Sequence, residues 1–255
     1  MNAVRQAGFE GAMRQWLGHR PLQEDAAEFF PIPGDGLLAL LADGMGGHLA
    51  GEIASREVIA SFSQSFCAHP HDDIPLRFEK ALNAANRHLR SIQKGAQIGN
   101  SGTTLVAVFL RRNKFWWLSV GDSMLLLWKE GERLIRLNED HSMRPIAEEQ
   151  WARGEISLPY ALRQRSILRS AIMGDEISLI DISREPLTLD EDSFLFLVSD
   201  GLDEWVEEIR QVDFEHMKEA SETSLDLLLD TIHCQVDGLD ISYADNGTIA
   251  VIRRY

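Results

Sequence analysis

The chain of 255 residues carries 40 Asp and Glu against 25 Lys and Arg, a formal net charge of −15 at pH 7, and 44% of its residues are hydrophobic. A surface this acidic repels nucleic acid phosphates and anionic lipid, so we expect neither nucleic acid nor a membrane as a partner. The apolar content suffices for a buried core, and no linker, repeat or low-complexity tract divides the sequence, so we expect one domain.

The sequence also bears on the compartment. It has no run approaching the roughly 18 apolar residues of a membrane span, and its N-terminal stretch lacks the apolar core of a signal peptide. Cys67 and Cys234 lie far apart, without the spacing of a metal or redox site, which favours a reducing compartment. We therefore expect a cytoplasmic protein, and we expect a monomer.

In chain order, apolar runs predict the strands and a 3.6-residue period predicts the helices. Strands are expected over residues 37–42, 103–110, 115–120, 124–128, 134–137, 193–198 and 248–252, and helices over 49–66, 76–92 and 224–236. Hairpin turns are expected at Asn113-Lys114 and Glu130-Gly131. Strands joined by hairpins, with helices in separate pairs, favour an α+β layered architecture over a doubly wound parallel sheet.

Carboxylates lie at the ends of several of these strands. Asp43 ends the run 37–42, and three of the next four residues are glycine. A carboxylate at a buried strand end costs several kcal/mol unless it is paired, hydrogen-bonded or bound to a cation. A single Asp-Gly is more often a turn than a site. The turn explanation weakens because five separate stretches supply such groups, namely Glu24 with Asp25, Asp43, Asp122, Asp200 and Asp245.

Clustered carboxylates indicate a site for hard cations. Mg²⁺ and Mn²⁺ take oxygen ligands and are held by a few carboxylates, whereas the eight histidines show no zinc-like spacing. Two such ions about 3.5 to 4 Å apart can activate a water and stabilise the oxygens of a phosphoryl displacement.

The motifs "RPLQED", "ADGMGGHLAGEIAS", "SGTTLVAVFL", "SVGDS", "DHS", "LVSDGL" and "DNGT" occur in this order between residues 20 and 252. Together they resemble the metal-dependent serine/threonine protein phosphatases of type 2C, in their compact bacterial form. The resemblance implies one catalytic domain over residues 1–255, built as a four-layer αββα sandwich of two antiparallel sheets flanked by antiparallel helices. It also implies a centre of two Mg²⁺ or Mn²⁺ ions and a flap-like segment over residues 143–174.

The resemblance assigns the metal ligands by position. Asp43 matches the carboxylate that bridges both metals, and the backbone oxygen of Gly44 matches a ligand of one of them. Glu24 matches a ligand of the second metal. Asp200 and Asp245 match ligands of the first metal.

Other positions match supporting roles in the family. Asp25 matches an outer-shell group that holds coordinated water, and Asp122 matches a position that helps bind a possible third metal. Arg20 matches the guanidinium that binds the substrate phosphate, where a planar fork suits two oxygens.

The sequence departs from the family pattern at three positions. Gln23 stands where the family usually has Asn, Met124 replaces the common Arg after "GDS", and Met45 stands where eukaryotic relatives carry a histidine proposed as general acid. His48 is a conceivable substitute acid, but we expect it to be structural, at the first turn of the following helix. The adjacent residues of "DHS" are expected to form a loop or cap, not a catalytic triad.

By resemblance, the expected reaction is direct hydrolysis of phosphoserine and phosphothreonine in proteins by a metal-bridged hydroxide, without a phosphoenzyme. No Cys or Ser nucleophile with a paired base is apparent. A bacterial Ser/Thr kinase and its substrates are the expected partners. Two alternatives remain open: an inert pseudophosphatase or phosphoprotein-binding module, and a hydrolase of a small phosphoester.

Overall fold

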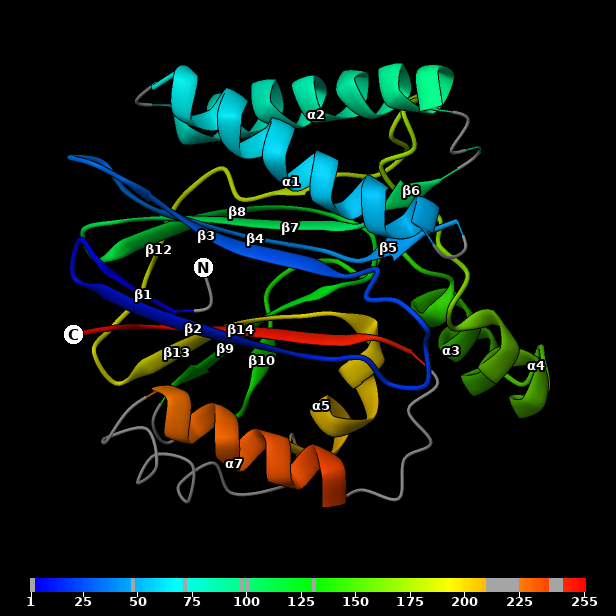
Figure 1. The fold of residues 1–255 in the computed structure, drawn as a ribbon. Coiled ribbons are helices and arrows are strands. Elements are labelled where there is room, and N and C mark those ends of the chain that lie inside the picture. The colour runs from blue at the N-terminus through cyan, green and yellow to red at the C-terminus, as the bar shows by residue number, and fades with distance from the viewer. Residues whose placement is uncertain are drawn as a thin grey trace.

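Two antiparallel sheets lie face to face at the centre of the fold, with helices on both outer faces (Figure 1). The computed structural model describes residues 3–46, 49–70, 73–96, 99, 101–129, 132–209, 225–238 and 245–255.

The first sheet joins the two ends of the chain. Its strands run in the order β1 (Ala3–Gln6), β2 (Phe9–Trp16), β14 (Gly247–Arg254), β13 (Ser193–Val198), β9 (Met124–Lys129) and β10 (Ile135–Arg136). The pairing of β14 with β2 sets Val251 opposite Ala12.

The second sheet carries the most apolar strands. Its order is β11 (Asp181–Ile182), β8 (Lys114–Val120), β7 (Leu105–Arg111), β4 (Gly36–Ala42) and β3 (Ala26–Ile32), and β12 (Leu187–Thr188) also pairs with β8. Next to it, β5 (Gly44–Met45) and β6 (Gly102–Thr103) form a small separate pair.

Helices complete four layers. The helices α1 (Leu49–Ala68) and α2 (Ile74–Ala96) cover the second sheet, while α5 (Asp203–Ile209) and α7 (Leu225–Gly238) cover the first (Figure 1). Two shorter helices, α3 (Arg144–Ala152) and α4 (Leu158–Gln164), lie beside one end of the sandwich (Figure 1). The expected α+β sandwich with an αββα layer order is confirmed.

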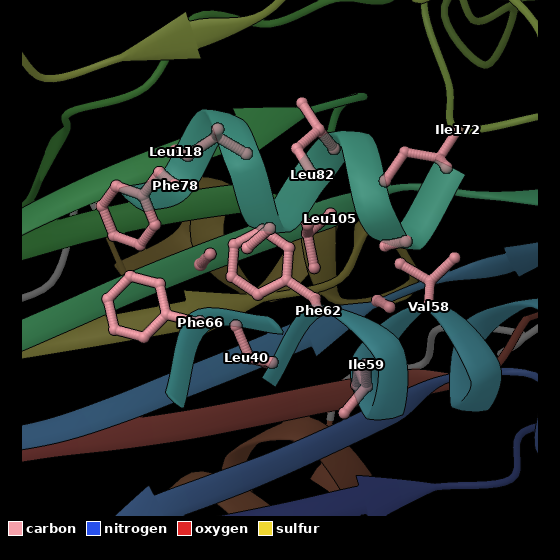
Figure 2. Packing of buried hydrophobic residues seen from close by; sticks show 14 of the residues in the cluster. Leu40, Val58, Ile59, Phe62, Phe66, Phe78, Leu82, Leu105, Leu118 and Ile172 are labelled. Carbon is pink, nitrogen blue, oxygen red and sulfur yellow. The ribbon is translucent and has the colours of Figure 1, made fainter. Parts of the chain in front are cut away.

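Strand β4 shows why a continuous apolar run forms here. All seven of its residues are buried because both faces of the sheet are covered. Leu38 and Leu40 belong to the cluster under α1 and α2, whereas Leu37 and Leu41 belong to the cluster between the sheets. Figure 2 shows the first of these clusters, in which Phe62 and neighbouring aromatic rings fill the space between helices and sheet.

The sequence did not predict the strands β1, β2, β3, β5, β11 and β12, and composition explains why β2 and β3 were missed. In β2, the buried Gly11 interrupts the apolar alternation because a side chain there would meet the ring of Phe29. Strand β3 contains Pro31, which is tolerated because β3 is the edge of its sheet.

Other expectations are adjusted by the structure. The β7–β8 turn falls at Arg112 and Asn113, one residue earlier than predicted. Residues 143–174, expected as a long loop, contain α3 and α4, which both have a proline at their first turn. The predicted turn at Glu130-Gly131 and the first residue of the predicted helix 224–236 lie outside the described residues. Within the described part of the chain, no helix is both long and apolar enough to cross a membrane.

Candidate metal centre

The predicted carboxylates meet at one end of the sandwich, where strands of both sheets begin or end. The register that sets Ala26 opposite Ala42 places Asp25 and Asp43 at the same end of the second sheet. In the first sheet, Val198 pairs with both Met124 and Ile249, so the segments that carry Asp122, Asp200 and Asp245 reach the same edge.

Asp25 is held by hydrogen bonds from the other sheet. Its Oδ2 accepts from Ser199 Oγ at 2.8 Å and from Thr248 Oγ1 at 2.6 Å. Burial raises the pKa of Asp25 to about 7, and the charges of Asp200 and Asp245 act in the same direction. The two hydroxyl donors oppose this rise without reversing it.

Asp43 is fixed through its backbone. Its N–H donates to Thr104 Oγ1 at 3.0 Å, and its carbonyl accepts from Thr103 Oγ1 at 2.8 Å. Burial raises the pKa of Asp43 well above its usual value, and the charges of Asp25 and Asp200 raise it further.

The Asp200 carboxyl interacts directly with Asp43 through a side-chain hydrogen bond. Burial raises the pKa of Asp200, while the bond to Asp43 and the charge of Arg144 oppose that rise. Arg144, at the start of α3, also forms an ion pair with Asp203. The segment expected as a flap is therefore tied to the site at its first helical residue.

Glu24 and Gly44 lie together against α1. A methyl group at Gly51 would overlap both the Glu24 carboxylate and the Gly44 carbonyl, so these two oxygens face the same point of the helix. The Glu24 backbone is held on both sides, because Asn246 Oδ1 accepts from its N–H at 2.8 Å and its carbonyl accepts from Ser55 Oγ at 2.6 Å.

Asp122 is buried in the turn that connects β8 of the second sheet to β9 of the first. Burial raises its pKa to about 7, and the charges of Asp200 and Asp140 add to this effect. Arg136 opposes the rise and donates from Nη2 to the Asp122 carbonyl at 2.8 Å. Asp140 also accepts from the N–H of Ser142 at 2.8 Å, so this part of the "DHS" motif forms the expected local loop structure.

Arg20 and Asp245 form an ion pair with each other. Arg20 Nη2 lies 2.7 Å from Asp245 Oδ2, and both side chains remain over 40% exposed. Exposed ion pairs of this kind contribute roughly 0–1 kcal/mol. Either residue can therefore leave the pair for a stronger interaction. The residue proposed to bind phosphate and a proposed metal ligand thus neutralise each other in this arrangement.

The carboxylate oxygens of the site are suitable ligands for hard divalent cations, although the side chains do not yet surround a common point. Among the described residues, no three Asp, Glu, His or Cys side chains form a group that could hold an ion as they stand. The side chains present are oxygen donors, and four carboxyls have raised pKa values because burial disfavours their ionised forms and the charges of neighbouring carboxylates add to the rise. A cation would replace the protons that otherwise relieve this repulsion.

Sequence reasoning missed several supporting residues. Gly51, Ser199 and Thr248 lie within predicted motifs or next to predicted ligands, so adjacency was the available signal. Gln23, which departs from the family pattern, accepts from the Asp25 N–H at 3.1 Å. Met124 is buried in the core on the first sheet.

Two residues from the comparison with the family pattern remain, Met45 and the candidate acid His48. Met45 is half-buried in β5, at the position where eukaryotic relatives carry histidine. His48 lies outside the described residues.

The chain belongs to the protein phosphatase 2C family, whose profile matches residues 20–230. It is 30% identical over 188 residues to the serine/threonine protein phosphatase PstP of Mycobacterium tuberculosis, a match that covers 73% of this chain and 36% of PstP. This chain therefore spans only about a third of the length of that relative. It is 27% identical over 214 residues to the serine/threonine phosphatase Stp of Listeria welshimeri, which covers 81% of this chain and 82% of Stp.

Solved structures agree with the fold. The catalytic domain of PstP in complex with two manganese ions is 26% identical and superposes with a TM-score of 0.70, over 96% of this chain and 97% of that one.

Gly51→Ala tests the position of the Glu24 carboxylate. Because the added methyl displaces Glu24 and Gly44 together, we expect Mn²⁺ affinity to fall about 10- to 100-fold while the chain remains folded. Titration calorimetry measures the affinity. Gly95→Ala is the matched control, since nothing lies within 4 Å of its new methyl. Equal affinities in the two variants would contradict the placement of Glu24.

Thermal unfolding at two pH values tests the carboxylate cluster. A carboxyl whose pKa is higher in the folded than in the unfolded chain destabilises the fold once it ionises, so the metal-free protein loses stability as the pH rises from about 4 through about 7. A cation favours the ionised form. We expect the gain in Tm from Mn²⁺ over EDTA to be larger at pH 7.5 than at pH 5.5, and an equal or smaller gain would contradict the cluster.

Proposed function

We propose that this chain is a metal-dependent phosphatase that hydrolyses phosphoserine and phosphothreonine in proteins. The observation that carries the proposal is the convergence of carboxylates from five chain segments at one end of the sandwich, with burial raising the pKa of Asp25, Asp43, Asp122 and Asp200. Membership of the protein phosphatase 2C family supports the proposal, as does the similarity to the serine/threonine phosphatases PstP and Stp.

The proposed centre holds two Mg²⁺ or Mn²⁺ ions, with Asp43, Gly44, Glu24, Asp200 and Asp245 as ligands. When bound, such ions activate water and neutralise the charge on the phosphoryl group. A third ion beside Asp122 is part of the same proposal.

The chain's own residues then position the reactants. Asp25, which is held by Ser199 and Thr248, would accept a hydrogen bond from water bound to a metal ion. Arg20 leaves its exposed pair with Asp245, which frees Asp245 as a ligand and turns the guanidinium to the substrate phosphate. The local positive charge is needed because a protein at −15 repels a phosphomonoester over most of its surface.

The alternatives differ in what they require. A pseudophosphatase usually lacks a metal ligand, whereas every proposed ligand is present here. Hydrolysis of a small phosphoester would use the same centre, and comparison of a phosphothreonine peptide with an aryl phosphate separates the two substrates. The proposed partners are a bacterial Ser/Thr kinase and its substrates.

Asp43→Asn and Asp200→Asn test the metal ligands. We expect each to lower Mn²⁺-dependent turnover of a phosphothreonine peptide by more than about a hundredfold, since even supporting partners of metal ligands contribute 10–100-fold. Asp226→Asn, an exposed carboxyl on α7, is the control and should retain full activity. Near wild-type turnover in either ligand variant at saturating Mn²⁺ would rule out its assignment.

Arg20→Ala tests phosphate binding. Loss of charged hydrogen bonds worth about 1.5–3 kcal/mol should lower kcat/KM roughly ten- to 150-fold, mostly through KM, and Arg20→Lys should recover part of the loss. Steady-state kinetics on a phosphopeptide provide the values. Arg184→Ala removes a comparable exposed ion pair, with Glu79, and should change kcat/KM little. A change below threefold in Arg20→Ala would exclude this role.

A further inference from the structure

A cavity lies at the end of the sandwich opposite the carboxylates. It has a volume of about 1000 Å³ and lies between the β3–β4 turn, the β7–β8 turn and the C-terminal end of α1, on the left in Figure 1. We call it the basic cleft, because the described residues that line it include Arg77, Arg111, Arg112 and Lys114 but, of carboxylates, Asp35 alone.

The positive charge of the basic cleft is unusual in a chain with a net charge of −15. Asp35 is shared by two guanidiniums, at 2.5 Å from Arg77 Nη1 and 3.4 Å from Arg111 Nη1. Within the described part of the chain, neither Arg112 nor Lys114 forms an ion pair with a carboxylate. Cationic side chains therefore outnumber the acidic groups that neutralise them.

Arg77 is the most constrained of these cations. Its side chain is only 1% exposed, its Nε donates to the Phe66 carbonyl at 2.7 Å, and its guanidinium lies 3.9 Å from the centre of the Phe66 ring. Its Nη2 is buried without any hydrogen-bond partner. A buried charged donor without an acceptor is unfavourable, and an anionic oxygen in the cleft would supply that acceptor.

Arg112 is kept in a backbone conformation that arginine disfavours. It is the first residue of the two-residue β7–β8 turn and has a φ of 62°. Glycine or asparagine is usual at such positions, because other side chains are strained there. Glycine would fit this position of the turn better, but only a residue such as Arg112 contributes a guanidinium to the cleft.

We propose that the basic cleft binds a small molecule that carries two or more phosphate groups, such as a nucleoside diphosphate. The cleft is the size of a small-molecule site, and Arg112 and Lys114 add two positive charges to the two guanidiniums that share the one carboxylate of Asp35, so the net charge of these side chains suits more than one phosphate group. Trp116, which lies 5.6 Å from the Arg111 guanidinium, adds an apolar wall for the rest of the ligand. Because the cleft and the carboxylates lie at opposite ends of the sandwich, the ligand does not compete with a substrate at the metal centre.

Calorimetry with ADP tests the proposal, using the full chain in excess Mg²⁺. We expect ADP to bind with one-to-one stoichiometry and sulfate to bind far more weakly. Arg112→Gly should weaken ADP binding about tenfold or more while Tm stays equal or rises, since the turn is relieved. Lys114→Gln, on the exposed start of β8, should also weaken it. Arg20→Ala, at the other end, should leave the ADP affinity unchanged.

Several results would overturn the proposal. Absence of ADP binding would do so, as would an affinity unchanged by both Arg112→Gly and Lys114→Gln. Loss of binding in Arg20→Ala would place the nucleotide at the metal centre instead. Sulfate binding as tightly as ADP would overturn the assignment to a ligand with several phosphates.

Discussion

The burial of several carboxylates at one place is the constraint on which the rest of this structure depends. Burial is the largest cause of the raised pKa of four carboxyls, and the charges of neighbouring carboxylates raise each of them further; the four are Asp25, Asp43, Asp122 and Asp200. Such a cluster cannot hold itself together. Its position must be imposed by strands whose cores are packed independently, and its charge must be relieved by protons or by cations.

The sandwich imposes that position across its two sheets. Asp25 precedes a strand of the second sheet, yet its hydroxyl donors, Ser199 and Thr248, belong to the end of the first. The cluster of side chains between the sheets, which includes Phe9 and Leu195, therefore fixes the relative position of the two halves of the centre. The opposite end of the sandwich holds the cluster of cationic side chains around Asp35.

The parts of the fold with strong local signals were predictable. The apolar run before Asp43 and the run 193–198 were recognised because both faces of their strands are buried. Strand β2 was not, because Gly11 owes its place to a contact with Phe29 that no local pattern records. Irregular hydrophobicity likewise hid α3 and α4, whose apolar faces are largely exposed.

The sequence likewise predicts some parts of the candidate site and not others. Its carboxylates could be listed from their positions at strand ends and from the family resemblance, because ligand chemistry depends on residue type. The contacts that hold them could not be predicted, because the close approach of Glu24 to Gly51 and the pairing of Arg20 with Asp245 join segments far apart in sequence. Arg20 and Asp245 also show that a predicted phosphate-binding residue and a predicted metal ligand can form an ion pair with each other when neither phosphate nor metal is bound.

The most direct measurement is a crystal structure of the chain grown with Mn²⁺, with anomalous diffraction recorded at the manganese edge. We predict two strong anomalous peaks bounded by Asp43, Glu24, Asp200 and Asp245, with Arg20 turned away from Asp245. Peaks elsewhere on the molecule, or none at this end of the sandwich under saturating Mn²⁺, would contradict it.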